Sequence, residues 1–380
     1  MISRETVAIE KAIVVRFTAI LAAALLAAAT AQARPVQSGV DDAVLSPLSG
    51  LATAAPRLLS SLKIASLSVA IVENGQTAEA HAWGQASPSQ PATIETLYNV
   101  ASLTKPVSAE VAMRLAAGGR ISLDEPMSAY WVDPDVADDP RSARLTPRLV
   151  MSHRSGLPNW RPAGGGKLSF VNEPGETFGY SGEGFEWLAR FIEAKTGEPF
   201  EDLAQSLVFE PSGMRETAYT RRPWIEGRLA VPYDADLKVL APQVADHYFA
   251  SDDLISTPRD YARFVVGMLQ KRGVTPDLYL EREKLQTDRR TQTCLGDEPG
   301  CAAEDGFGLG WETLLIGGRR FLMHTGMDDG TFTFVYLEPK NGTGLVMFTN
   351  STNGWMAVLP VLELTGADPG FIDHLRRNIS

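Results

Sequence analysis

The amino-acid sequence predicts an α/β protein in which one sheet is built from both chain ends and a mainly helical region is inserted between them. Three observations indicate this arrangement: β-rich segments near both ends, helical periodicity between them, and a composition able to bury a large core. The chain has 380 residues, of which 44% are apolar and 21% charged, which excludes collagen, a coiled coil and a disordered tail. A formal net charge of −11 without any basic run argues against nucleic acid as a partner.

Residues 1–33 have the pattern of an export signal. Three basic residues precede a short apolar stretch, and Ala31-Gln32-Ala33 supplies a cleavage pattern of small residues; the basic residues are Arg4, Lys11 and Arg16. We therefore expect a periplasmic or secreted mature chain that begins at Arg34 and has no stable membrane span. An N-terminal membrane anchor is the alternative, although the apolar stretch is short for a bilayer. The segment before it is long, so either translation starts later or the basic region is extended.

The sheet is expected to begin with a hairpin. Residues 64–73 and 77–84 are predicted strands, and Asn74-Gly75 between them is the strongest short-range signal for a tight hairpin turn. Three further strands are expected near the other end, at residues 320–324, 331–337 and 344–350. A closing helix is expected around residues 355–364, where Pro360 either kinks the helix or marks its true start.

Residues 34–380 are large for one compact core, so we expect two lobes with a cleft between them. The sheet lobe would comprise residues 34–115 and 303–380, and the helical lobe residues 116–302. Helices are predicted at residues 184–195 and after Ser256. In the second helix, Thr257 is a suitable N-cap, Pro258 suits the first helical position and Asp260 favours the positive end of the helix.

Ser102 and Lys105 are the strongest candidates for chemistry. The segment that follows Ser102 predicts a largely apolar helix that ends at Gly118-Gly119. Residues three apart share a helix face, so the two side chains would lie side by side at a helix N-terminus. There an unprotonated amine could take the hydroxyl proton, and the helix dipole would favour a developing oxyanion.

The same four-letter pattern also occurs at Ser60 to Lys63, where it is better explained as the end of a solvent-facing helix. Similarly, Lys195-Thr196-Gly197 has the composition of an ordinary helix terminus. His324-Thr325-Gly326 ends an apolar β segment instead, so it could line a cleft edge beside the serine.

These residues resemble the serine β-lactamase and penicillin-binding-protein-like hydrolases, in particular the branch of class C β-lactamases, D-aminopeptidases and family VIII esterases. The resemblance covers nearly the whole mature chain and rests on several ordered motifs. They are Ser102-Leu103-Thr104-Lys105, residues 119–126 (GRISLDEP), residues 151–158 (MSHRSGLP), Pro174-Gly175 with Phe178-Gly179-Tyr180-Ser181, residues 307–311 (FGLGW) and His324-Thr325-Gly326. The resemblance implies a β-lactamase/transpeptidase-like fold of the α+β type, with an antiparallel sheet flanked by helices.

The resemblance also implies residue roles. Ser102 would be the acylated nucleophile, Lys105 a proton-transfer partner, and Tyr180 a residue that shares base and acid duties with Lys105. The alternative for Tyr180 is a buried ring with a bonded hydroxyl. The backbone N–H groups of Ser102 and Met327 would form the oxyanion hole. Substrate would also meet three positions of the second and third motifs, namely Gly182, Thr325 and Gly326.

Two positions depart from the family pattern. Gly182 stands where the second motif usually has Asn, which removes a hydrogen-bonding contact to amide side chains. His324 replaces the Lys of the third motif, so a permanent cation becomes a group that is mostly neutral near pH 7. Both changes leave acyl transfer possible but weaken the contacts expected of a good β-lactamase. We also hypothesise that Asp328 and Asp329 face the cleft and repel anionic substrates.

Other polar residues are assigned no chemistry. His153 is interpreted as a structural loop residue, and His81, His247 and His374 show no clustering. No ligand pattern indicates a metal and no Gly-rich loop after a strand indicates a nucleotide, so no cofactor is expected. Cys294 and Cys301, the two cysteines of the chain, could form a small-loop disulfide or remain two thiols.

The leading hypothesis is an exported, cofactor-free serine hydrolase that forms an acyl-enzyme at Ser102, with His324 helping to position substrate. A neutral or weakly anionic ester, or a small amide, fits the altered motifs best. One alternative is a class C-like β-lactamase or a D-Ala-type peptidase acting on cell-wall peptides. Another is a non-catalytic binding protein that retains the fold.

Overall fold

The computed structural model describes residues 46–162, 166–293 and 301–379. The predicted signal at residues 1–33 lies outside this range. The strands are β1 (Ser66–Glu73), β2 (Gln76–Ser87), β3 (Gln90–Pro91), β4 (Tyr98–Asn99), β5 (Ile255–Ser256), β6 (Thr287–Asp288), β7 (Glu304–Phe307), β8 (Glu312–Ile316), β9 (Arg319–Asp328), β10 (Thr331–Glu338) and β11 (Thr343–Thr349). The helices are α2 (Ser49–Leu62), α3 (Thr104–Ala117), α4 (Pro147–Met151), α5 (Gly182–Thr196), α6 (Phe200–Ala204), α7 (Glu210–Ser212), α8 (Pro258–Leu269), α9 (Pro276–Glu283), α10 (Arg290–Thr293), α11 (Val358–Leu364) and α12 (Pro369–Ile379).

Both chain ends contribute to one antiparallel sheet, as predicted. Within the described residues its strand order is β3-β2-β1-β11-β10-β9-β8-β7-β6, so β1 from the start of the chain pairs with β11 from its end. The predicted hairpin is present between β1 and β2. Asn74 and Gly75 at its turn have φ angles of +51° and +68°, the left-handed values that a tight hairpin turn requires.

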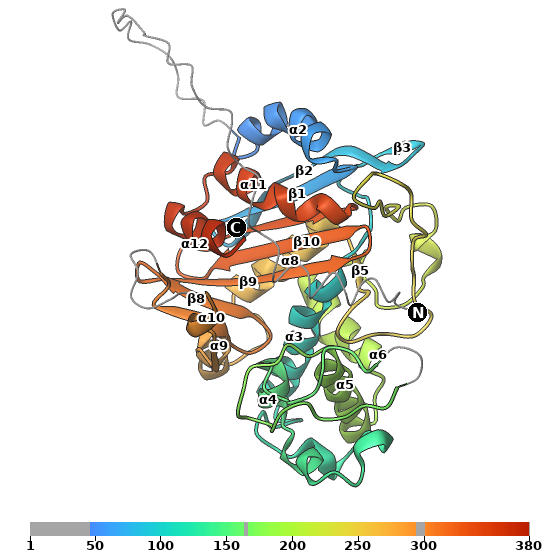
Figure 1. The fold of residues 1–380 in the computed structure, drawn as a ribbon, viewed down its shortest axis with the longest axis vertical. Helices are drawn as coiled ribbons and strands as arrows, with labels where there is room; N and C mark the ends of the chain where they lie inside the picture. The colour runs from blue at the N-terminus through green and yellow to red at the C-terminus, as the bar shows by residue number, and fades with distance from the viewer. Residues whose placement is uncertain (1–45, 163–165, 294–300, 380) are drawn as a thin grey trace, which may run out of the picture.

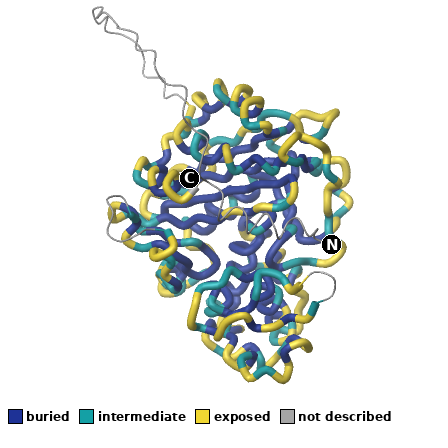
Figure 2. Tube along the Cα trace, in the orientation of Figure 1, coloured by how far each residue is buried: buried dark blue, intermediate teal, exposed yellow. Residues whose placement is uncertain are grey.

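Helices cover both faces of this sheet (Figure 1). On one face α2, α11 and α12 share a core with alternate residues of β1, among them Leu67 and Val69. On the other face Ala70 and Val72 of β1 join a larger core that includes residues of α3, α5 and α8. Because successive strand residues point to opposite faces, β1 is buried on both sides, and the central strands form the buried layer in Figure 2.

The helical region packs below the sheet around α3, α5 and α6 (Figure 1). Helix α3 lies at the boundary and is buried from Thr104 to Leu115. Helix α8 falls within the range 116–302 assigned to the helical lobe, yet it packs against β1, β2 and β11. Its N-terminus is as predicted: Asp260 N donates to Thr257 Oγ1 at 3.1 Å, and Pro258 takes the first helical position. No helix of the described ranges is long and apolar enough to span a membrane.

The structure separates the sequence motifs from their look-alikes. Lys63 caps the end of α2 with a left-handed φ of +53° and forms an exposed ion pair with Asp236. Lys195 lies in the last turn of α5, and Gly197 N donates to Glu193 O in a left-handed cap. Both are therefore helix termini, as the sequence indicated.

Candidate active site

Ser102 lies on a 3-10 turn, η1 (Ala101–Leu103), which leads directly into α3. Neighbouring segments hold this turn in place. Thr333 Oγ1 of β10 donates to Val100 O at 2.8 Å, and Ala101 N donates to Asn99 Oδ1 at 2.8 Å. Ala101 has a φ of +47°, a left-handed conformation that costs about 1–2 kcal/mol in a residue with a Cβ. The bonds around the turn thus hold Ser102 on a strained backbone of the kind found at functional sites.

Lys105 lies beside Ser102, one helical turn later. Its Nζ donates to Ser102 Oγ at 3.0 Å and to Ser251 O at 2.9 Å. The Lys105 side chain is fully buried, whereas Ser102 is partly exposed. The ring centroid of Tyr180 is 4.8 Å from Lys105 Nζ. Ser102, Lys105 and Tyr180, for which the sequence predicted roles in one reaction, therefore lie together in the fold.

Tyr180 comes immediately before α5, and the first turn of that helix orients it. Ser181 is the N-cap: its Oγ accepts from Gly184 N at 2.9 Å and donates to Pro158 O at 2.9 Å. His153 stacks on the Tyr180 ring with 4.3 Å between centroids, and its Nδ1 accepts from Ser181 N at 3.1 Å. Burial and, to a smaller degree, the Lys105 ammonium hold the pKa of His153 well below its usual range. His153 is thus a neutral ring against Tyr180, a contact that the loop interpretation did not anticipate.

His324 lies on β9, with its ring centroid 6.2 Å from that of Tyr180. Its Nδ1 donates to Thr325 O at 2.7 Å. Burial lowers the pKa of His324 to about 3, and the Lys105 ammonium acts in the same direction. The third motif therefore presents a neutral imidazole at the position where the family pattern has a cation.

Gly326 brings β9 directly against the turn that holds Ser102. A Cβ on Gly326 would lie 2.3 Å from Val100 O and 2.4 Å from Thr333 Oγ1, so only glycine fits. Thr325 and Met327 alternate with it, and both side chains are exposed. Because Met327 follows Gly326, its backbone N–H belongs to the strand that contacts η1. Its role in an oxyanion hole stays a prediction.

Gly182 has no room for the side chain that the family pattern has there. A Cβ at this position would lie 2.8 Å from Asn159 O and 3.2 Å from the Trp160 ring. Gly182 N instead donates to Asn159 O and Oδ1, each at 3.0 Å. Trp160 also lies with its ring centroid 5.9 Å from Lys105 Nζ. Asn159 and Trp160 therefore occupy the space of the missing side chain, and no sequence motif pointed to them.

A cavity of about 1190 Å³ lies beside this group of residues. Trp160 lines it, whereas Ser102, Lys105 and Tyr180 are not among its lining residues. Its lining is aromatic and acidic; the aromatic residues are Tyr98, Trp131, Trp160, Trp187, Tyr248 and Phe249, and the acidic residues are Asp133, Glu183, Glu186, Asp252, Asp253, Asp328 and Asp329. Two arginines also line it, and both have acidic partners. Arg161 pairs with Asp133 and Glu183, and Arg190 with Glu193. Acidic side chains therefore outnumber basic ones on the cavity wall.

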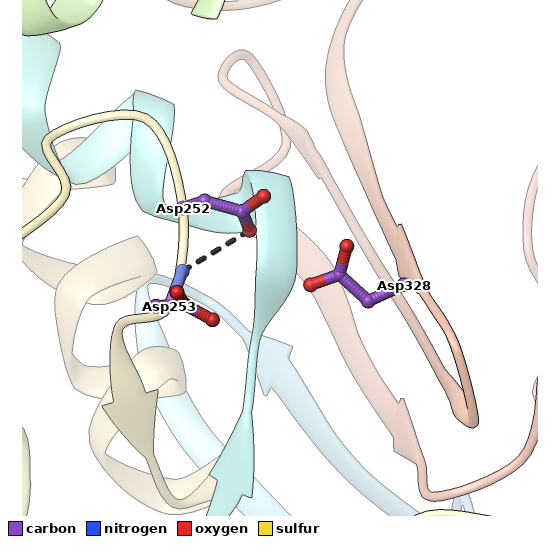
Figure 3. Close-up of side chains that lie close together, drawn as sticks. All are labelled: Asp252, Asp253 and Asp328. Atoms are coloured by element: carbon purple, nitrogen blue, oxygen red, sulfur yellow. Dashed lines mark hydrogen bonds between the residues drawn. The ribbon is translucent and has the colours of Figure 1, made fainter. Parts of the chain in front are cut away.

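Three of these carboxylates lie together in Figure 3: Asp252 and Asp253 precede β5, and Asp328 ends β9. Asp253 N donates to Asp252 Oδ1 at 3.1 Å. Burial raises the pKa of Asp252 to about 7, while Lys105 opposes this shift. Burial and the two neighbouring carboxylates raise the pKa of Asp328 well above its usual range. One oxygen of each residue lies within 4.8 Å of the others, but acidic groups alone do not define a metal site and we assign none.

Cys294 lies outside the described residues, so its possible disulfide with Cys301 stays a prediction. His81, His247 and His374 do not join the Ser102 site. His247 lines the cavity, and His374 lies 3.5 Å from an Asp305 carboxylate oxygen.

Comparisons with known proteins agree with this geometry. The family model described as Beta-lactamase matches residues 51–359. The D-alanyl-D-alanine-carboxypeptidase/endopeptidase AmpH of Escherichia coli (strain K12) is 24% identical over 339 residues, which cover 79% of this chain and 85% of that protein. Esterase EstB of Burkholderia gladioli is 29% identical over 175 residues, which cover 38% of this chain and 43% of that protein.

A solved structure, the octameric penicillin-binding protein homologue from Pyrococcus abyssi, is similar in fold. The superposition has a TM-score of 0.70 at 20% sequence identity and covers 84% of this chain and 77% of the Pyrococcus abyssi chain. The fold predicted from the ordered motifs is thereby confirmed. Because the family model also spans every strand of the sheet together with Ser102, Tyr180 and His324, the chain belongs to the beta-lactamase family.

Proposed function

We propose that this protein is an exported serine hydrolase that is acylated at Ser102 and acts on uncharged esters or small amides. The observation that carries the proposal is the Lys105 Nζ contact to Ser102 Oγ at 3.0 Å, beside Tyr180 and next to a large cavity. A buried amine adjacent to a hydroxyl is the arrangement expected of an activated nucleophile. Export rests on the sequence pattern of residues 1–33 alone.

The proposed reaction begins when Ser102 Oγ attacks the substrate carbonyl carbon and Lys105, as a free amine, accepts the hydroxyl proton. The carbonyl oxygen becomes an oxyanion that the N–H groups of Ser102 and Met327 stabilise. The bond to the leaving group then breaks, and Tyr180 or Lys105 returns the proton to the leaving alcohol or amine. Water attacks the acyl-enzyme, which releases the acid and restores Ser102.

The charge of the site supports an uncharged substrate. The carboxylates of Asp252 and Asp328 face each other across the cavity wall, and His324 is neutral because burial lowers its pKa to about 3. A substrate carboxylate would therefore meet acidic side chains, whose negative charge grows as pH rises because their pKa values are raised, and no cation of the third motif. This supports the hypothesis that Asp328 and Asp329, both of which line the cavity, repel anions.

A D-Ala-type peptidase is a second candidate because AmpH, named as such an enzyme, aligns with 79% of this chain. The acidic lining of the cavity counts against it, since a peptide that ends in D-Ala carries a carboxylate. A β-lactamase meets the same objection. A non-catalytic binding protein would have no use for a buried Lys next to Ser102.

The first experiment compares hydrolysis of p-nitrophenyl acetate by the mature protein and by Ser102→Ala at equal concentration. We expect turnover that disappears in the variant, with a chromogenic cephalosporin and a D-Ala-D-Ala peptide turned over more slowly by the wild type. Turnover that survives in Ser102→Ala would exclude this nucleophile. A faster reaction with the peptide than with the ester would favour the peptidase.

A second experiment tests the charge of the cavity. At a separation of about 10 Å and an effective dielectric constant of about 40, two unit charges interact by about 0.8 kcal/mol, or roughly fourfold in kcat/KM. Asp328→Asn should therefore raise kcat/KM for an anionic p-nitrophenyl succinate ester about fourfold relative to the acetate ester. The effect should grow from pH 6 to pH 9, because the Asp328 pKa is raised. Asp373→Asn, an exposed change on α12, is the control, and equal ratios in both variants would refute the repulsion.

A further inference from the structure

Glu186 is a carboxylate beside the site to which the proposed reaction gives no role. It lies on α5, which begins two residues after Tyr180. Its carboxylate accepts three hydrogen bonds from one short segment: from Ala250 N at 3.1 Å, from Ser251 N at 3.0 Å and from Ser251 Oγ at 2.5 Å. This number of donors on one carboxylate fixes the position of the segment relative to α5.

The segment that Glu186 holds is the one that binds Lys105. Ser251 is fully buried, and its carbonyl oxygen accepts from Lys105 Nζ at 2.9 Å. The same Nζ donates to Ser102 Oγ, so the amine is held between a carbonyl and the hydroxyl. The position of that carbonyl therefore decides where the amine lies relative to Ser102.

We propose that Glu186 is a positioning residue for Lys105, acting through the Ser251 peptide. The inference rests on the proposed function of the Ser102 and Lys105 pair. The carboxylate fixes the Ser251 carbonyl, and that carbonyl in turn fixes Lys105 Nζ beside Ser102 Oγ. Gly182 leaves no side chain from the second motif to do this, because Asn159 and Trp160 fill that space.

Several charged or titratable groups surround Lys105. Glu186 faces it from α5, His153 from the segment after α4, Asp252 from the segment before β5, and His324 and Asp328 from β9. Burial raises the pKa of the Glu186 carboxyl, whereas its hydrogen bonds and Lys105 favour the carboxylate. Glu186 is distinguished from the other acids by its three donors and by its link to the Ser251 peptide.

The hydrogen bonds of Glu186 predict a loss of rate rather than of substrate binding. Without them the Ser251 carbonyl is free to move, and Lys105 Nζ loses its fixed position beside Ser102 Oγ. The acylation step should therefore slow, whereas KM should change little. A residue that only contacted substrate would change KM instead.

The test measures p-nitrophenyl acetate hydrolysis and the rate of Ser102 labelling by a fluorophosphonate. Glu186→Gln keeps one of the two acceptor oxygens, so both rates should fall by less than in Glu186→Ala. Glu186→Ala should lose kcat by about tenfold or more, with KM within about twofold, because the anchor of the carbonyl is gone. Ser251→Ala, which keeps the peptide and loses the Oγ bond, should show a smaller loss of kcat. Glu198→Gln changes the same charge just past the end of α5, where Glu198 is half-exposed and pairs with Arg120, and should match the wild type.

The outcomes separate this inference from the proposed function. No Ser102-dependent labelling of the wild type would refute the proposed function, and this inference with it. Normal labelling of the wild type combined with a wild-type kcat in a folded Glu186→Ala protein would overturn the positioning role alone. So would a change confined to KM, since that would make Glu186 a substrate contact. Thermal unfolding of each variant shows whether it is folded, and Ser251→Ala provides the test of the kcat effect if the Glu186 variants are not.

Discussion

Gly326→Ala is the most direct test of how β9 supports the site. The added Cβ would lie 2.3 Å from Val100 O, whereas a Cβ needs at least 3.0 Å, so the strand and the Ser102 turn must separate by about 0.7 Å. Val100 O cannot rotate away, because it belongs to the backbone of the segment and accepts from Thr333 Oγ1. The displacement falls directly on Met327 N, the next backbone donor along β9.

The size of the effect follows from that distance. A misplacement of about 1 Å in a catalytic site can lower a rate about 10²-fold, and loss of one oxyanion-hole donor costs about 10²–10³-fold. We therefore expect kcat for p-nitrophenyl acetate to fall about 10²-fold, which corresponds to roughly 2.7 kcal/mol in the barrier. The same overpacking should lower the free energy of unfolding by roughly 1–3 kcal/mol.

The assay pairs steady-state kinetics with thermal unfolding, and Gly344→Ala serves as the control. A Cβ on Gly344 would lie 2.8 Å from Tyr336 O, a backbone clash in the same sheet. Gly344 pairs with Leu337 on β10, whereas Gly326 pairs with Thr333 nearer the other end of that strand. The control should unfold at a lower temperature and keep kcat within about twofold. A folded Gly326→Ala protein with wild-type kcat would refute the reasoning.

Two further predictions concern buried charge. Glu110→Ala leaves Arg114 and Arg282 without their shared carboxylate in the core, where their side chains are 4% and 1% exposed. Urea unfolding should therefore show that the free energy of unfolding falls by roughly 3–5 kcal/mol. A fall below about 1 kcal/mol would mean that the two guanidinium groups find other partners. The pKa of His324 is about 3 in the folded chain, whereas that of an unfolded His is about 6.5. Below pH 6.5 the unfolded chain therefore takes up a proton that the folded chain does not, and the free energy of unfolding falls as pH decreases toward 3. His324→Phe should flatten the fall in unfolding free energy between pH 6.5 and pH 4 by up to about 1.4 kcal/mol per pH unit, and identical slopes in the two proteins would contradict the burial of a neutral imidazole.

Local signals in the sequence were sufficient where one short segment determines its own structure. Asn74 and Gly75 adopt the positive φ angles that the hairpin needs, and Thr257 caps α8 as its position before Pro258 indicated. Helix α11 begins at Val358, so Pro360 lies in its first turn, two residues after the start that one of the two alternatives placed at Pro360. These features depend on residues within about four positions of one another, the range over which sequence patterns act.

The surroundings of Lys105 could not be found in this way. Ser251 contributes a backbone oxygen, and any residue type carries one, so the sequence gives no sign of the contact. Glu186 acts through that same segment, although it is far from it along the chain. His153 was interpreted correctly as part of a loop, but its stacking on Tyr180 depends on how two loops meet. Such contacts are decided by tertiary packing rather than by local pattern.

The pairing of β1 with β11 has a consequence for how the protein comes to be folded. Leu67 lies opposite Thr349, so the centre of the sheet joins residues from the first and last thirds of the chain. Such long-range contacts close late, because a long loop must be ordered before they form. During synthesis, β1 has no partner on this side until β11 has left the ribosome. Ser102 is synthesised early, whereas β9 and β10, which complete its surroundings, are synthesised late. A chain that ends before β9 would therefore carry the nucleophile but lack Met327.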